Sequence, residues 1–332
     1  MTAAPSQPAL ETEDKPRRVV SRVSGGDKVF RIVVRGAGVT VLVITGLILV
    51  FLLRRSLTAF GRAGLSFFTT QSFNANTDHF GIAALLVNGV LIACVALVIA
   101  IPVAVGTALY ISEYAPQRLR RLLISLIDLM AAIPSIIYAL WGLYFLEGRM
   151  LGLDGWLSRH LAFIPIFRIQ GGPTTLAATY SDSPFVVGVV VSLLVIPIVT
   201  SLAREIFSQA PQAEREAAYA LGATRWGMVR TVVLPFGRAG VIGSGLLGMG
   251  RALGDAIVIS FLITPISVIS FHLLQSGGNS IPYTILLDIN NGPEWVSALM
   301  AAGLVLFAMT LLVNVIGSIV SGRSRSGLVN VD

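Results

Sequence analysis

The chain has little charge, almost no lysine and a single cysteine. Only 12% of its 332 residues are charged. Cys94 has no second cysteine to pair with, which excludes a disulfide within the chain. Lysine occurs only at Lys15 and Lys28. A Walker A phosphate loop needs a Gly-Lys pair, so the chain is not itself a P-loop ATPase, and ATP-driven work would have to come from a partner.

Histidine is also scarce, and the three histidines are far apart without ligand spacing, so we predict no metal site. The net charge of +7 does not indicate nucleic acid, because the basic residues are scattered between apolar runs and form no stripe. They are better interpreted as determinants of membrane topology.

Hydrophobic residues make up 55% of the chain, and its mean hydropathy is +0.81. These values exclude a soluble domain. Six apolar runs cover residues 36–53, 81–112, 122–146, 185–202, 240–264 and 295–320. A bilayer span needs roughly 20 apolar residues. The sequence therefore predicts an all-α integral membrane protein with six transmembrane helices.

The flanking segments are polar. Residues 1–28 contain three prolines and many charges, which predicts a disordered tail. Residues 29–322 would form the six-helix membrane domain, with a polar loop at 203–236, and 323–332 a short second tail. With both termini inside, 17 basic residues fall on the cytoplasmic side and six on the other. This asymmetry predicts that both termini and the polar loop are cytoplasmic.

The polar loop has the residues expected of a helix, a turn and a second helix. Glu216-Ala217-Ala218 are strong helix formers, Gly222 permits a sharp turn, and Leu234-Pro235 stop the second stretch. Between membrane spans such a unit is a docking surface for another protein, although an ordinary connecting loop is the simpler alternative. The outward connections at 54–80, 147–184 and 265–294 are long, and long loops are usually functional or disordered.

Arg251 and Asp255 lie at i and i+4 within an otherwise uncharged run. A charge at membrane depth costs at least ~2.5 kcal/mol and normally faces the bundle interior. Counted from Gly240, Arg251 lies near the middle of the bilayer. The pair is either a site on a substrate pathway, where arginine suits an oxyanion, or an ion pair that locks two spans together.

Asp128 is the third charge predicted inside the membrane, about two turns into its run and shortly before Pro134 and Ser135. It either lines the pathway or satisfies an arginine on another helix, and both interpretations stay open. Ser135 is a further candidate pathway residue.

The spacing of Glu216-Ala217-Ala218, Gly222 and Leu234-Pro235 resembles the EAA loop of ATP-binding-cassette (ABC) import permeases, which contacts the ATPase. Two further segments, Met-Gly-Arg-Ala-Leu-Gly-Asp at 249–255 and Ala-Ile-Pro-Ser-Ile-Ile-Tyr-Ala-Leu-Trp-Gly at 132–142, resemble phosphate-transport permeases. Through Trp141-Gly142 they are more similar to the PstC-type than to the PstA-type subunit. In that family the arginine and acid are implicated in phosphate movement; Asp255 departs from the usual glutamate.

The resemblance implies a type I ABC importer permease in a bacterial inner membrane. Its partners would be a PstA-type second permease, two copies of a PstB-type ATP-binding subunit and an extracytoplasmic PstS-type phosphate-binding protein. ATP and Mg would be bound by the ATPase, and this chain would hold no cofactor and be no enzyme itself. Three rivals remain: the same machine for another oxyanion such as sulfate, an ion-coupled secondary transporter, and a membrane scaffold.

Overall fold

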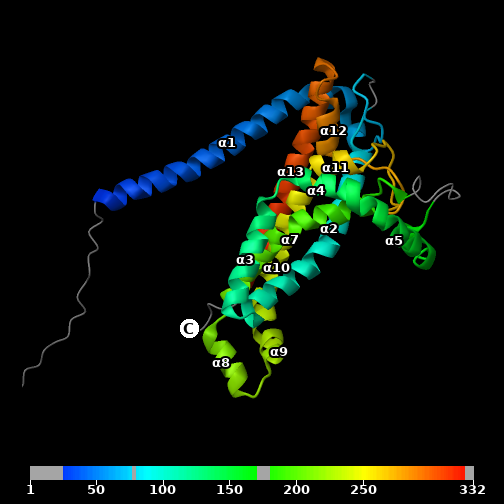
Figure 1. Ribbon diagram of the computed structural model, residues 1–332. Coiled ribbons are helices and arrows are strands. Elements are labelled where there is room, and N and C mark those ends of the chain that lie inside the picture. Colours follow the sequence, from blue (N-terminus) through cyan, green and yellow to red (C-terminus); the bar gives the residue numbers. More distant parts are fainter. Residues whose placement is uncertain (1–24, 77–79, 170–179, 326–332) are drawn as a thin grey trace, which may run out of the picture. The chain divides into compact units, whose positions relative to one another are not determined.

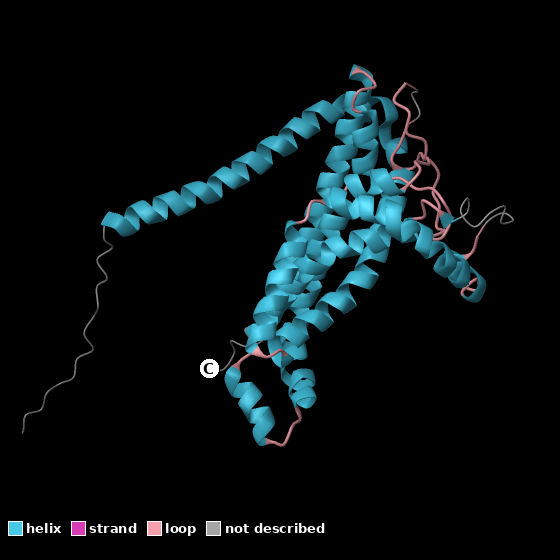
Figure 2. Ribbon diagram, in the orientation of Figure 1, coloured by secondary structure: helices cyan, strands magenta, loops and turns pink. Residues whose placement is uncertain are grey.

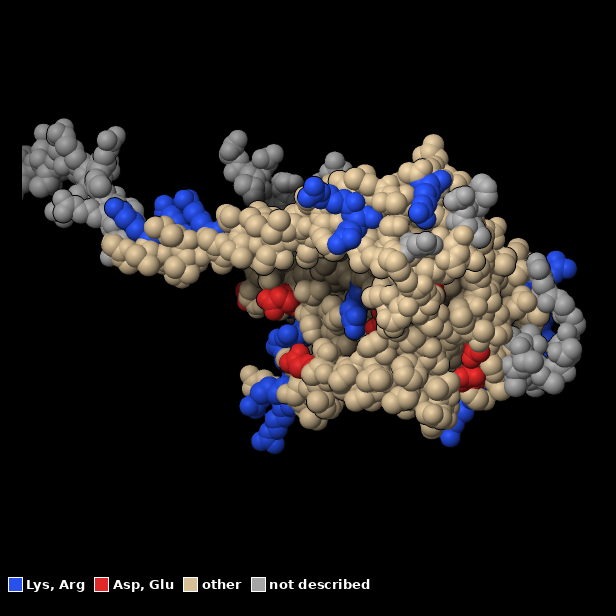
Figure 3. Space-filling view, turned by 90° about the horizontal axis from the view of Figure 1, so that it is seen from above, with Lys and Arg blue, Asp and Glu red and all other residues tan. Residues whose placement is uncertain are grey.

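The computed structural model describes residues 25–76, 80–169 and 180–325. This part of the chain consists of helices and loops without a β-sheet (Figure 2), apart from one isolated bridge between Pro265 and Gly278. It contains six helices long and apolar enough to cross a membrane. The face seen in Figure 3 is mostly uncharged, with scattered basic side chains and a few acidic ones, some of them next to each other. The prediction of an all-α protein with six spans is confirmed.

The chain divides into two units, Met1–Ile48 and Leu49–Asp332. The described part of the first unit is the beginning of α1 (Gly25–Ala63). Helix therefore begins inside the predicted tail of residues 1–28, and residues 1–24 lie outside the described part. The second unit holds the end of α1, the 3₁₀ turn at Gly64–Phe68 and the elements that follow.

In the second unit one π-helical turn joins α4 to α5 and another joins α9 to α10, while a third extends the end of α2. Figure 1 shows α8 and α9 at one end of this unit and α12 near the other. The helices are α2 (Ala83–Leu109), α3 (Gln117–Ala132), α4 (Ser135–Trp141), α5 (Glu147–His160), α7 (Pro184–Ser208), α8 (Gln212–Ala220), α9 (Arg225–Met228), α10 (Leu234–Leu253), α11 (Ile257–Leu262), α12 (Ile281–Asp288) and α13 (Pro293–Arg325). The π-helical turns are η2 (Tyr110–Tyr114), η3 (Gly142–Leu146) and η5 (Val229–Val233).

The centre of the second unit is the contact between α2 and α7. Ala96, Ala100 and Ala104 recur every fourth residue on α2 and are fully buried. Small residues allow two helix backbones to approach closely in a membrane protein. Gly188 of α7 also allows a close approach of the two helices, since a Cβ there would lie 2.5 Å from Cγ1 of Val95. Close backbone approach therefore accompanies a core of aliphatic side chains that includes Ile92, Val191 and Val195.

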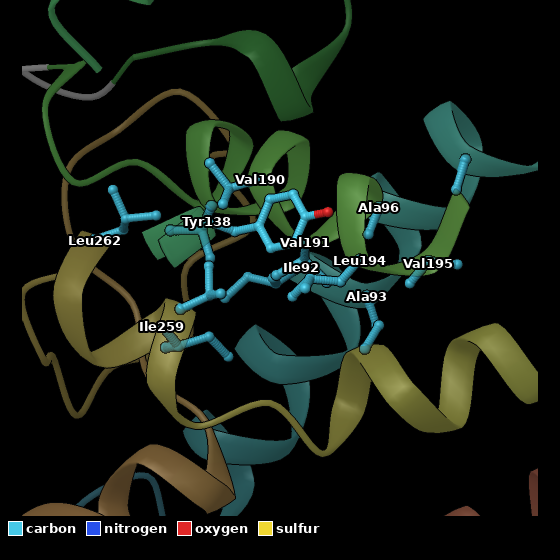
Figure 4. Close-up of a cluster of buried hydrophobic side chains, with 14 of the residues drawn as sticks. Ile92, Ala93, Ala96, Tyr138, Val190, Val191, Leu194, Val195, Ile259 and Leu262 are labelled. Carbon is cyan, nitrogen blue, oxygen red and sulfur yellow. The ribbon is translucent and has the colours of Figure 1, made fainter. Parts of the chain in front are cut away.

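Tyr138 of α4 extends this core toward α11. Figure 4 shows its ring among aliphatic side chains such as Val190 and Val191 of α7 and Ile259 of α11. Its hydroxyl donates a hydrogen bond of 2.9 Å to the carbonyl oxygen of Met130. The contact ties α4 to the end of α3 across the break between the two helices.

The third span differs from the prediction. We expected a helix over 122–146, whereas α3 ends at Ala132, Ile133 is extended, and the candidate span is Ser135–His160. The reason is Pro134, because a residue before proline is disfavoured in the helical region. Asp128 consequently lies on α3, is exposed, and is outside the candidate spans. The predicted bounds of the third span are therefore wrong, whereas the depth of Asp128 in the membrane stays a prediction.

The fifth span also differs. We expected 240–264, but the candidate span is Arg225–Leu253, and α10 ends at Leu253 before a separate α11. Gly254 follows the helix end, and the Asp255 carboxylate accepts a hydrogen bond of 2.9 Å from the Val258 amide at the start of α11. The Asp255 carboxylate thus caps the first turn of α11, which begins as a helix separate from α10. The prediction that Arg251 and Asp255 share one helix is therefore wrong.

The predicted topology can be tested with single cysteines in a Cys94→Ala background. Phe163→Cys and Ala213→Cys fall on opposite sides of the membrane in the six-span arrangement, and both positions are exposed. An impermeant thiol reagent added outside intact cells should label the first variant, and the second only after the cells are opened. Equal labelling of both from outside would contradict the arrangement, and the Cys94→Ala protein alone measures the background.

Candidate functional site

Within the predicted loop at 203–236, α8 and α9 form a helical hairpin between the end of α7 and the start of α10. The turn between them contains Gly222, whose φ of 83° lies in the left-handed region that side chains rarely adopt. The Thr224 hydroxyl then accepts a hydrogen bond of 3.1 Å from the Gly227 amide and caps α9. Local chemistry thus explains both the turn and the start of the second helix.

The hairpin presents a mixed surface. Among the predicted coupling residues, Glu216, Ala217, Gly222 and Pro235 are exposed, and Ala218 and Leu234 are half-buried. Three large side chains on it, Tyr219, Leu221 and Trp226, are also exposed, with Leu221 at 89%. Exposed apolar side chains rimmed by charge are typical of a protein-interaction surface.

Arg215 fastens the hairpin to the rest of the second unit. Its Nη1 donates to Glu113 Oε2 at 2.7 Å, and its Nη2 donates to the Phe207 carbonyl oxygen at 2.7 Å. Its Nε donates to the Ala210 carbonyl oxygen at 3.2 Å. The Ser112 hydroxyl supplies the other Glu113 oxygen with a hydrogen bond of 2.8 Å. Both charged side chains are largely buried, so each one depends on these partners.

Two further contacts support this attachment. The Arg225 guanidinium lies 5.3 Å from the centre of the Tyr114 ring, within the range of a cation–π interaction. Beneath the hairpin, Phe207 of α7 packs with Met228 and Val229 in a buried cluster. Sequence analysis missed Arg215 and Glu113 because they are 102 positions apart, and a glutamate at the end of an apolar run gives no signal of its partner.

Arg251 and Asp255 do meet, although across a helix end. Arg251 Nη2 lies 3.4 Å from Asp255 Oδ2, and the aspartate side chain is 3% exposed while that of Arg251 is 42% exposed. The aspartate is therefore held by α11 and by the arginine, whereas the guanidinium keeps donors free to face outward from this chain. Such a geometry suits an anion that is shared with another surface.

The other two pathway candidates stand apart from this pair. Asp128 is on α3 and Ser135 is the first, half-buried residue of α4. Within the described residues no hydrogen bond or ion pair joins either of them to Arg251 or Asp255. A groove of about 690 Å³ between α7, α10 and α13 is lined by Pro235 and other residues of the hairpin end, but by none of these four side chains.

In the part of the chain that the structure describes, no three His, Cys, Asp or Glu side chains lie close enough together to hold a metal ion. His79 lies outside that part.

Comparison with known proteins defines the class. The family model described as binding-protein-dependent transport system inner membrane component matches residues 100–326. The chain belongs to this family of membrane permease subunits. A solved bacterial ABC transporter involved in the import of alginate has a chain of similar fold, with a TM-score of 0.53, 18% identity, and coverage of 90% of this chain and 98% of that one.

More particular relatives carry a phosphate-transport name. The chain is 35% identical over 328 residues to the phosphate transport system permease protein PstC 2 of Mycobacterium tuberculosis, covering 97% of this chain and 98% of that protein. It is 36% identical to PstC of Mycobacterium leprae, covering 84% and 88%. The resemblance to PstC-type permeases is thereby confirmed.

Replacement of Gly222 tests the hairpin as a docking surface. Gly222→Val forces a β-branched residue into the left-handed region at a cost of about 1–3 kcal/mol, although no atom lies near enough to clash. We expect an ATPase to be pulled down with the unaltered protein and to be lost with Gly222→Val, while insertion into the membrane persists.

Gly222→Asn is the matched control, because asparagine tolerates the left-handed conformation. It should retain ATPase binding. Equal retention by the valine and asparagine variants would show that the turn does not position a docking surface.

Proposed function

We propose that this chain is the transmembrane permease subunit of an ATP-driven phosphate importer. It forms half of the translocation pathway and couples that half to cytoplasmic ATPases. The observation that carries the proposal is the relationship, over nearly the full length of both chains, to proteins named phosphate transport permease PstC.

The exposed hairpin supports the coupling part of the proposal. Tyr219, Leu221 and Trp226 give an ATPase an apolar surface, and Glu216 gives it a charged contact. Two copies of a PstB-type ATPase would bind ATP and Mg, one on this hairpin and one on the corresponding loop of a PstA-type permease. An ion-coupled secondary transporter would leave this surface without an occupant.

The proposed membrane arrangement follows from the basic residues. The hairpin and both termini lie in the cytoplasm of a bacterial cell, and residues 29–322 form the membrane domain. A PstS-type phosphate-binding protein then delivers the anion to the opposite face, where the connection at 265–294 contains α12.

Arg251 has the chemistry that the pathway requires. The planar fork of an arginine side chain can donate two parallel hydrogen bonds to a phosphate oxyanion. Asp255 fixes the guanidinium from one side at 3.4 Å, and the exposed remainder points away from the buried core. An anion would be held between this arginine and the second permease, and would leave when the two subunits separate.

The proposed substrate is tested by uptake of labelled phosphate and labelled sulfate into vesicles that hold the complete complex. Phosphate accumulation that depends on ATP and on the binding protein is the expected result. Accumulation of sulfate in preference to phosphate would overturn the substrate assignment but leave the permease role intact.

Arg251 can be tested in the same vesicles. Arg251→Gln keeps some hydrogen bonding but loses the charge, and a hydrogen bond to a charged group contributes about 1.5–3 kcal/mol. Uptake should therefore fall by about tenfold to a hundredfold. Arg251→Lys should recover only part of it, because a point charge cannot form the bidentate fork.

Variants of Asp255 separate its two contacts. Asp255→Asn keeps an acceptor for the Val258 amide and loses the ion pair, so impaired uptake would be due to Arg251 and not to α11. Asp255→Glu should be tolerated. If the Arg251→Leu/Asp255→Leu double variant assembles normally and still imports phosphate, the pair is a structural lock and has no substrate role.

A further inference from the structure

Arg215 connects three elements at the hairpin end of the molecule. It belongs to α8, and it donates to the carbonyl oxygens of Phe207 in the last turn of α7 and of Ala210 just after that helix. It also forms an ion pair with Glu113 of η2, the continuation of α2. We propose that this ion pair is the link through which movement of the hairpin reaches α2, and that both residues are positioning residues for transport. The inference rests on the proposed function, since it takes the hairpin to be the ATPase docking site.

The three core helices differ in how they can follow the hairpin. From Arg225 to Leu253 the chain passes through α9, η5 and α10 without leaving helical conformation, so α10 follows the hairpin covalently. Between α7 and α8 lie only residues 209–211. In contrast, η2 is about a hundred positions away in sequence, so α2 depends on side-chain contacts to follow the hairpin.

The hydrogen bonds of Arg215 can hold α8 to both α7 and η2 in one relative position. The last carbonyl groups of a helix lack their usual partner four residues on, and for Phe207 that residue is Pro211, which has no N–H. The Ala210 amide donates to the Phe207 carbonyl oxygen instead, at 3.2 Å. Arg215 adds a second, shorter hydrogen bond of 2.7 Å to the Phe207 carbonyl oxygen, and its positive charge is favourable at the C-terminal end of α7. A single planar guanidinium thus fixes the relative positions of α7 and η2.

Glu113 does not stabilise the helix end formed by α2 and η2. A negative charge at the C-terminal end of a helix is disfavoured by the helix dipole, and its side chain is 3% exposed. Apolar side chains of similar volume are often as stable as a buried ion pair. Such residues would hold the segments together but could slip, whereas the ion pair has one register. A directional link explains why a charged pair occupies a buried position.

The test is a comparison of phosphate transported per ATP hydrolysed in proteoliposomes that contain the complete complex. The Glu113→Leu/Arg215→Met double variant removes the ion pair and leaves no unpaired buried charge, while the contact of Arg225 with Tyr114 stays in place. We expect the ATPase to stay bound and ATP to be hydrolysed, because the exposed hairpin surface is unchanged. The ratio of phosphate to ATP should fall about tenfold, within the usual range of coupling between distant sites.

Two further variants complete the design. Arg215→Lys keeps the charge but cannot reach three acceptors at once, so its ratio should be intermediate. Arg118→Gln is the matched control, because Arg118 is an exposed arginine at the start of α3, and it should keep the ratio of the unaltered complex.

A ratio equal to that of the unaltered complex in the double variant would overturn the link. If the double variant does not assemble, Arg215→Lys decides: an unchanged ratio overturns the proposal and a reduced ratio supports it. Failure of the proposed function appears separately, in the unaltered complex. If the unaltered complex imports sulfate, the ratio of transported anion to hydrolysed ATP is measured with sulfate and the test of the ion pair stands. If the unaltered complex does not bind an ATPase, both the proposed function and the proposed link are overturned.

Discussion

Backbone hydrogen bonding is the constraint on which this structure depends. Inside a bilayer no water can satisfy a free N–H or C=O group, so the chain must remain helical or find an internal partner wherever a helix ends. Pro102 and Pro197 lie inside α2 and α7 without ending them. Where helices do break, side chains compensate: the Tyr138 hydroxyl bonds to Met130 near the end of α3, and Asp255 caps α11.

These breaks also create the functional geometry. Because α10 ends at Leu253, Arg251 lies in a last helical turn and Asp255 at the start of the next helix. The aspartate is buried by its role in α11, so it can hold the guanidinium in place while the arginine keeps an exposed face. An unbroken helix would have left two charges side by side on one surface, with neither of them positioned by the backbone.

At the hairpin end, polar interactions attach α8 and α9 to the membrane helices while the outer surface of the hairpin stays accessible. The exposed apolar side chains of α8 and α9 face outward, whereas Arg215 and Arg225 contact η2. The proposed ATPase contact and its attachment to the membrane helices therefore use different residues of one short hairpin, and substitutions can separate them.

The sequence by itself determined the class of fold, the number of spans, the position of the polar loop and the turn at Gly222, because hydropathy, length and glycine punctuation are local properties. It also supplied the resemblance to PstC-type permeases. It misjudged the bounds of the third and fifth spans, because a hydropathy average does not detect the helix break at Pro134 or the end of α10 before the Asp255 cap. Only the tertiary structure decided that Glu113 meets Arg215: their charges, 102 positions apart, come within 2.7 Å only when α2 and α7 pack together and carry η2 and α8 to the same end.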